Sequence, residues 1–182
     1  MVEIANADGS GDIGVELDIA EVEADLPVPY TEYDPDNYHG LYVRLVEDGP
    51  LITLYRSGKY IISGCSSFEE LHETNRAFLQ TLAELDIINT SIETGFTVQN
   101  VVCTGEFQRS VNLNALSIGL GLEAVEYEPE QFPGLIYRPP DFPAVLLVFA
   151  NGNAVITGAA DVETAEEAFD HLQTKVEGLL GD

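Results

Sequence analysis

The chain has 182 residues, enough to bury a hydrophobic core, and 45% of them are hydrophobic, which favours a folded protein over a disordered one. Its formal net charge is −25, from seven lysines and arginines against 32 aspartates and glutamates, which ordinarily argues against a nucleic-acid partner. The longest apolar runs, such as residues 144–150, are far shorter than the roughly 20 residues that span a bilayer, so we expect a cytoplasmic protein with no membrane partner.

The acidity has a second interpretation, in which it reflects the solvent rather than the ligand. In molar salt the Debye length falls to about 3 Å, so neighbouring carboxylates repel one another weakly and keep the protein hydrated. Lysine is scarce beside abundant aspartate and glutamate, a balance typical of a salt-loving cytoplasm. The charge therefore does not exclude a nucleic-acid partner if the cell is halophilic.

The first half of the chain predicts a strand, a short helix, a group of strands and a long helix. Ser67 and Glu70 form a capping box that begins the long helix. The apolar stripe of this helix consists of Phe68, Leu71, Phe78, Leu82 and Leu85. Because a helix with one apolar stripe covers one face of a sheet, we expect an α+β arrangement.

The second half predicts the same series of elements. Asn112 and Asn114 can cap a short helix that ends at Leu120, and Asp161 caps a long final helix. Strands are predicted at residues 97–107, 124–128, 134–138, 144–150 and 153–157. The chain therefore consists of two α+β halves, which join near residues 87–96.

The two halves also share their residues. The segment at residues 32–66 returns 94 residues later, at residues 126–160, without a gap. Nine of the 35 aligned pairs are identical, and most of the others are conservative exchanges. The chain is therefore an internal duplication, with repeats expected at residues 1–91 and 92–182, and any site should have two related halves.

Residues that hold metals or cofactors are sparse. Cys65 and Cys103 occupy non-equivalent positions in the two halves, and the three histidines are scattered without ligand spacing. Residues 9–14 match the G-x-G-x-x-G pattern of dinucleotide sites, but their counterparts at residues 103–108 do not. We therefore expect no metal, no cofactor and no catalytic site, and so no enzyme.

One predicted strand is apolar at every position, although a sheet covered by helices on one side should alternate. In the segment 145–149, Leu146 and Val148 can pack beneath the helices, which leaves Val145, Leu147 and Phe149 on the opposite face. That face is a sandwich core, a homodimer interface or a broad apolar surface for a ligand. The pattern alone leaves these alternatives open.

At these residues the sequence resembles the TATA-box binding protein family. The segment Tyr127–Arg138 is similar to the stirrup of the family's second repeat, Val98–Val102 to its opening strand and Val155–Ala159 to its last strand. The resemblance covers nearly the whole chain. It implies a pseudo-twofold saddle, in which a curved ten-stranded antiparallel sheet carries four helices on its convex face.

The resemblance implies binding in the DNA minor groove without catalysis. Phe132 and Phe149 match the two phenylalanines that wedge between base steps and kink the duplex. Their first-repeat counterparts are Tyr38 and Tyr55, whose hydroxyls need a partner once buried. The family thus implies four intercalating rings, two in each repeat.

The same resemblance assigns the residues that line the groove and contact phosphates. The minor-groove residues are Asn6, Asp8, Ile61, Ser63, Asn100, Val102, Leu147, Val155 and Thr157. Arg44, Lys59 and Arg138 match phosphate-contacting positions. Because A·T and T·A look alike in the minor groove, a protein with one central asparagine in each repeat suits a TATA element.

The first repeat departs from the family pattern. Asp8 stands where the family has valine, and it points a carboxylate at base edges that are themselves acceptors; His39 and Thr53 replace apolar or small residues. The expected lysines are missing near Ser66, Asn153 and Ala160. With few cationic contacts, apolar burial and wedge insertion must supply the affinity, and we hypothesise that cations bridge carboxylates such as Asp8 to the DNA.

We therefore expect an archaeal, halophilic general transcription initiation factor that binds and bends TATA-element promoter DNA at the nucleoid. Glu128 and Glu130 match positions through which the family docks transcription factor B, so that factor and the RNA polymerase pre-initiation complex are the expected partners. One alternative is a divergent paralogue with weak DNA binding that acts through protein contacts. The other is a duplicated ligand-binding domain, which would pack the four wedge rings internally.

Overall fold

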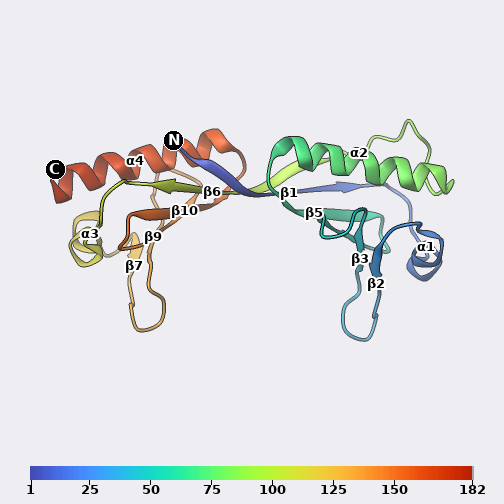
Figure 1. Ribbon diagram of the computed structural model, residues 1–182, viewed down its shortest axis with the longest axis horizontal. Helices are drawn as coiled ribbons and strands as arrows, with labels where there is room; N and C mark the ends of the chain where they lie inside the picture. Colours follow the sequence, from blue (N-terminus) through green and yellow to red (C-terminus); the bar gives the residue numbers. More distant parts are fainter. Residues whose placement is uncertain (182) are drawn as a thin grey trace. The chain divides into compact units, whose positions relative to one another are not determined.

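The computed structural model describes residues 1–181, which contain ten strands and four helices (Figure 1). The first half contains β1 (Glu3–Asp12), α1 (Ile19–Asp25), β2 (Tyr30–Glu32), β3 (Leu41–Arg44), β4 (Leu51–Leu54), β5 (Lys59–Cys65) and α2 (Phe68–Glu84). The second half contains β6 (Thr97–Glu106), α3 (Leu113–Leu120), β7 (Val125–Glu126), β8 (Leu135–Tyr137), β9 (Val145–Val148), β10 (Asn153–Ala159) and α4 (Val162–Leu180). The predicted series of elements is confirmed in both halves.

The strands of the first half pair in the order β2-β3-β4-β5-β1 and those of the second half in the order β6-β10-β9-β8-β7, and all of these pairs are antiparallel. The predicted α+β class, with ten antiparallel strands and four helices, is confirmed. The strands predicted at residues 124–128 and 144–150 shorten to β7 and β9, because the residues beyond them enter turns. In the β9–β10 turn, for example, the N–H of Gly152 donates to the carbonyl of Phe149 at 2.9 Å.

The described chain falls into two compact units, which we call the first unit (residues 6–99) and the second unit (residues 1–5 with residues 100 onward). The offset of 94 residues relates their elements: β1 and β6, β4 and β9, and β5 and β10 begin and end at equivalent positions. The duplication therefore applies to the fold as well as to the sequence. The repeat boundary expected between residues 91 and 92 stays a prediction.

Three of the four described helices begin at capping residues that the sequence predicts, although Asn112 alone caps α3 and Asn114 lies inside that helix. Asp161 accepts a hydrogen bond from the N–H of Thr164 at 2.7 Å, and Asn112 accepts one from Ala115 at 3.0 Å. Ser67 likewise accepts from the N–H of Glu70 at 3.0 Å.

A capping box also predicts a bond from the N–H of Ser67 to the Glu70 carboxylate, and this part of the prediction is wrong. The Glu70 carboxylate accepts instead from the N–H and the hydroxyl of Ser66, at 2.8 and 2.7 Å, so the residue before the N-cap supplies both donors. These hydrogen bonds to the charged form lower the pKa of Glu70. The start of α2 is thus fixed by Glu70 together with two serines.

In each unit the long helix lies over one face of the sheet, with α2 on β5 and α4 on β10 (Figure 1). Leu146 and Val148 of β9 are fully buried on the helix-covered face, whereas Val145 and Leu147 are half-buried on the other. The predicted apolar second face of this strand is therefore confirmed. We call the face of each sheet opposite its long helix the open face.

The two cores place an aromatic ring in equivalent space, but the ring comes from different elements. In the first unit it is Tyr60 of β5, fully buried, whose hydroxyl bonds Asn75 of α2. At the equivalent positions of the second unit β10 has Ala154 and α4 has Phe169, so the helix supplies the ring. A Cβ on Gly11 would lie 2.6 Å from Tyr60, and a Cβ on the equivalent Gly105 would lie 2.6 Å from Phe169.

Candidate nucleic-acid interface

The first unit carries a pair of tyrosines, Tyr38 from the β2–β3 loop and Tyr55 from the β4–β5 turn. Their ring centroids are 6.2 Å apart with an interplanar angle of 72°, and their hydroxyls are 2.6 Å apart. Tyr42 stacks on Tyr38 at 5.4 Å. Burial and the hydrogen bond with Tyr38 raise the pKa of Tyr55 to about 12, so Tyr55 is neutral at physiological pH.

The second unit carries Phe132 and Phe149 at the equivalent positions with almost the same geometry. Their centroids are 5.9 Å apart and their planes meet at 70°. Phe132 is 37% exposed, and Phe149 and both tyrosines are half-buried. The structure thus brings the four predicted wedge residues together as two pairs, and it leaves part of every ring open to a ligand.

A glycine lies against each ring pair, and the sequence analysis did not assign it a role. A Cβ on Gly40 would lie 2.8 Å from Tyr38 and 3.1 Å from Tyr55. A Cβ on Gly134 would lie 2.8 Å from Phe132 and 3.0 Å from Phe149. Only glycine lets both rings lie this close to the backbone, which gives a physical reason for the identity of these two positions in the repeat.

The groove-lining residues predicted in the second unit lie on its open face. Asn100, Val102, Leu147, Val155 and Thr157 are half-buried there, and β9 pairs with β10 so that Leu147 lies opposite Val155. Their strand neighbours Val101, Cys103 and Ile156 are fully buried on the helix side. The alternation therefore produces a floor of mainly apolar side chains around one asparagine.

The first unit places Asn6, Asp8, Ile61 and Ser63 on its own open face, with Ile61 40% exposed. Thr53, which lies opposite Ile61 in the β4–β5 pair, is only 7% exposed. Its methyl group packs at Gly40, where an added Cβ would lie 2.8 Å from it. Thr53 is therefore largely covered by its own unit.

A β-bulge beside each floor turns a glycine N–H toward the polar residues. The register slips between Ile156 and Ala159, where Gly158 has a φ of 78°, and its N–H donates to the Oδ1 atom of Asn100 at 3.1 Å. The equivalent Gly64, with a φ of 83°, donates to the Oδ1 atom of Asp8 at 3.3 Å. Asp8 thus takes the hydrogen bond that in the second unit goes to the asparagine.

Two of the three predicted phosphate-contacting residues have partners within the protein. Arg44 donates to the carbonyl of Gly49 and lies over the ring of Tyr30, with its Cζ atom 5.8 Å from the ring centroid. Arg138 pairs with Glu126 at 2.8 Å in an exposed ion pair. Lys59 is exposed beside an open cleft of about 830 Å³ that Tyr55 and Ile61 also line.

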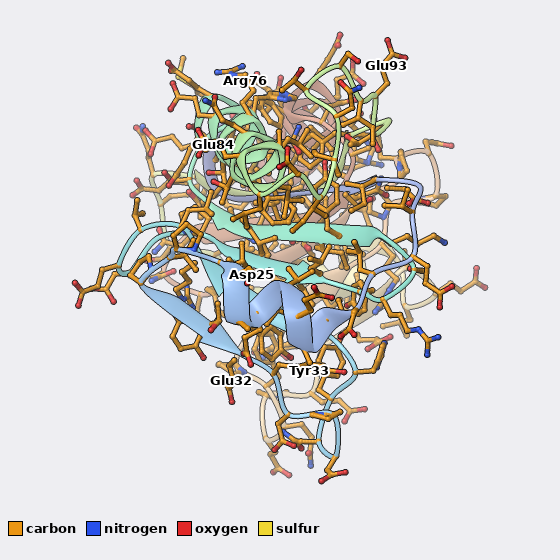
Figure 2. The ribbon with its side chains drawn as sticks, turned by 90° about the vertical axis from the view of Figure 1, so that its right-hand side faces the viewer. Asp25, Glu32, Tyr33, Arg76, Glu84 and Glu93 are labelled. Carbon is orange, nitrogen blue, oxygen red and sulfur yellow. The ribbon has the colours of Figure 1, made fainter. Side chains whose placement is uncertain are left out.

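The second unit has an equivalent cleft of about 850 Å³, bordered by Phe149 and Val155. Asn153 occupies the position of Lys59 there, as the sequence predicts. Elsewhere on the first unit, Figure 2 shows Asp25 of α1, Glu32 of β2, Glu84 of α2 and Glu93 of the segment before β6, and all four are exposed. The cleft beside Tyr55 is lined by Lys59 and by Arg56, which pairs with Glu16, whereas no lysine or arginine among residues 1–181 lines the cleft beside Phe149.

The predicted partner residues lie in the β7–β8 loop, which extends away from the long helix of its unit (Figure 1). Glu128 and Glu130 are exposed, and the loop is closed by the N–H groups of Gln131 and Phe132, which donate to the Glu128 carbonyl at 2.9 and 3.0 Å. The turn therefore fixes Phe132 and presents the two carboxylates beside it.

Comparison with known proteins then decides the family. The model of the family described as "Transcription factor TFIID (or TATA-binding protein, TBP)" matches residues 1–85 and again residues 95–179. The chain belongs to the TATA-binding protein family. Its membership makes it a DNA-binding transcription initiation factor and not an enzyme, and it sets aside the ligand-binding alternative.

Individual relatives cover nearly all of the chain. TATA-box-binding protein C of Halobacterium salinarum is 66% identical over 98% of this chain and 99% of its own length. TATA-box-binding protein B of the same organism is 40% identical, over 98% and 94%. The solved structure of Methanococcus jannaschii TBP has 32% identity and a TM-score of 0.85, covering 97% of this chain and 98% of that one. The fold expected from the sequence is confirmed, and the halophilic, archaeal source that the sequence predicts is that of the similar Halobacterium salinarum proteins.

Two further findings concern metal sites and membrane spans among the described residues. Within residues 1–181 no group of three histidine, cysteine, aspartate or glutamate side chains is placed to hold a metal ion. None of the helices among these residues is long and apolar enough to cross a membrane. The G-x-G-x-x-G match also has a structural explanation, because Gly9 and Gly11 lie inside β1 rather than in a loop that opens a helix.

Proposed function

We propose that this member of the TATA-binding protein family binds TATA-element promoter DNA through the minor groove and bends it, and that it then recruits transcription factor B and RNA polymerase. The observation that carries the proposal is the repeated wedge: in each unit, two part-exposed rings meet at about 70° over a glycine, beside a half-buried floor. Wedges of this kind unstack base steps and kink the duplex toward the major groove. The site of action is promoter DNA at the nucleoid.

The energetics differ from those of most DNA-binding proteins. Neutralising phosphates normally releases counterions, so affinity falls steeply with salt. Here Arg44 and Arg138 have protein partners and Asn153 replaces a cation. Apolar burial must therefore offset the few kcal/mol of unstacking per kinked step, and cations are taken up by carboxylates that face the DNA.

The recruiting surface is the β7–β8 loop with Glu128 and Glu130. Both carboxylates are exposed, and the turn that carries them also holds Phe132. A partner that binds these carboxylates would therefore contact the same loop that enters the DNA. Charge reversal at both positions should abolish binding of transcription factor B to the DNA complex and leave DNA binding intact, as a gel-shift titration would show.

Fluorescence anisotropy of a labelled TATA duplex tests the DNA-binding proposal, from about 0.2 M to molar KCl. The wild type should bind more tightly as KCl rises, and Phe149→Ala should lose binding. Phe142→Ala is the matched control, because Phe142 is a half-buried ring of the same unit that contacts His171 of α4 instead of the open face. Affinity that falls with KCl at the usual slope would contradict the cation-uptake hypothesis.

A second candidate function is a paralogue that binds DNA weakly and works through protein contacts. It is favoured by one observation, the carboxylate of Asp8 on the open face of the first unit. Absence of binding at every KCl concentration, with transcription factor B still captured through the β7–β8 loop, would establish it.

A further inference from the structure

The hydrogen bonds of the open faces fix the direction in which each central asparagine points its amide. In the second unit the backbone N–H of Gly158 can only donate, so the Asn100 atom that meets it at 3.1 Å is the carbonyl oxygen. The Asn100 NH₂ group is then available to a ligand, since within residues 1–181 no acceptor bonds it. The second floor therefore offers a donor.

In the first unit the arrangement is reversed. The Asp8 carboxylate accepts from the N–H of Gly64 at 3.3 Å and from the Nδ2 atom of Asn6 at 3.1 Å. Because a carboxylate can only accept, the NH₂ group of Asn6 is directed at Asp8, and its carbonyl oxygen is left for a ligand. Both protein bonds end on the Oδ1 atom of Asp8, so the Oδ2 atom is also left as an acceptor among the described residues.

The minor groove contains few groups that could satisfy acceptors. A·T and T·A pairs present only the N3 of adenine and the O2 of thymine, which are acceptors, and they match the donor of Asn100. The 2-amino group of guanine is the one donor that a base pair presents in this groove. A carboxylate held against A·T edges would lose its hydration without gaining a partner.

We propose that the first unit selects a G·C pair, with the Asp8 carboxylate accepting a hydrogen bond from the 2-amino group of guanine. The proposal rests on the minor-groove binding proposed above and deepens it. The preferred element is then asymmetric: the half bound by the second unit is A·T, and the half bound by the first unit contains a guanine at the position that faces Asp8. A hydrogen bond between an amino donor and a carboxylate is charge-assisted, which strengthens the selection.

The repeat itself supplies the variant that should remove this preference. Val102 is the equivalent of Asp8 in the second unit, so Asp8→Val installs a side chain that the same fold already accommodates. Without the carboxylate, the N–H of Gly64 should bond the carbonyl oxygen of Asn6, as that of Gly158 bonds Asn100. The first floor should then offer a donor and prefer A·T.

A base-analogue scan tests the proposal. In a labelled TATA duplex each adenine is replaced in turn by 2,6-diaminopurine, which adds the 2-amino group and keeps the pairing with thymine. At a position in one half of the element the replacement should raise wild-type affinity about tenfold, and it should raise that of Asp8→Val at no position. Guanine paired with cytosine there should reproduce the gain, and inosine, which lacks the amino group, should lose it.

The possible results separate this proposal from the proposed function. A duplex that is bound in a Phe149-dependent way but gains nothing from the amino group at any position would overturn the guanine proposal alone. The same follows if the gain persists in Asp8→Val, or if affinity depends on the K⁺ concentration and not on the amino group. No binding of any duplex by either protein would overturn both proposals.

Discussion

In the second unit the open face is a set of apolar side chains around one donor, Asn100, whereas in the first unit the same positions of the fold hold a carboxylate and an asparagine turned the other way. The wedge rings hardly differ, with interplanar angles of 70° and 72°. Under the proposed function, bending and base selection are therefore separate properties. The ring geometry is set by loops and glycines that both repeats keep, and base selection is assigned to a few side chains on the open faces.

The largest effect should come from the aromatic rings that fill the two cores. Phe169→Ala removes the ring that packs on Phe107 and Gly105, and Tyr60→Ala removes its first-unit equivalent. Each should lower the free energy of unfolding by about 3–5 kcal/mol, measured by urea denaturation in molar KCl. Phe142→Ala, at a half-buried ring, should cost clearly less. An equal loss of unfolding free energy in all three variants would show that the fully buried rings contribute no more to stability than the half-buried one.

The glycines beneath the wedges should come next. Gly40→Ala and Gly134→Ala each place a methyl group about 2.8 Å from a wedge ring, which must then move. Overpacking of this kind costs about 1–3 kcal/mol, and the displaced rings should weaken DNA binding in both variants. Gly178→Ala is a control, because a Cβ there meets nothing within 4 Å. Unchanged anisotropy titrations for both wedge variants would contradict the role given to these glycines.

Removing one hydroxyl from the first core should have a smaller effect. Tyr60→Phe deletes the group that bonds Asn75 and Thr94 and leaves their polar atoms unpaired beside the ring. We expect a loss of about 1–2 kcal/mol in urea denaturation. The equivalent residue of the second unit, Ala154, has no hydroxyl. The loss of stability in Tyr60→Phe therefore measures what the tyrosine hydroxyl contributes beyond the packing of the ring. A gain in stability would contradict the hydrogen-bond assignment.

At neutral pH the smallest effect should be that of Tyr55, whose ionisation changes stability only in alkaline solution. Because the pKa of Tyr55 is raised from 10.0 to about 12, its neutral form contributes stability that is complete below pH 10 and is lost as the pH rises through about 12. Tyr55→Phe should therefore flatten the fall in the free energy of unfolding between pH 9 and 12. Phe149 cannot titrate, so the second wedge adds no pH dependence of its own to the stability. Identical pH profiles of stability for wild type and Tyr55→Phe would exclude a contribution of Tyr55 to the loss of stability at high pH.

The duplication made much of the fold predictable, because a gap-free repeat constrains each element twice. Asn112 and Asp161 cap their helices as predicted, and the apolar second face of β9 was readable from Val145 and Leu147. That Tyr60 of a strand and Phe169 of a helix fill equivalent space in the two cores was not predictable. A comparison of equivalent positions misses this relation, because the ring belongs to a different element in each repeat.

The candidate site was predictable in its residues but not in its hydrogen bonds. The positions of the four rings and of the floor follow from a family resemblance, and their roles on DNA stay predictions. The amide direction of Asn6 depends on Asp8 and on a bulge at Gly64, which become neighbours only when β1 pairs with β5. Gly40 and Gly134 could have been singled out, since their identity in the repeat was visible and lacked an explanation.

The most direct test of the repeated wedge is the bend itself. Fluorescence resonance energy transfer between the ends of a short TATA duplex, at saturating protein and molar KCl, would compare wild type with Tyr38→Ala/Tyr55→Ala and with Phe132→Ala/Phe149→Ala. Each double variant should lose one kink, so each should give transfer between that of free DNA and that of the wild-type complex. Wild-type transfer in either double variant, on DNA shown to be bound, would contradict the assignment of these rings as wedges.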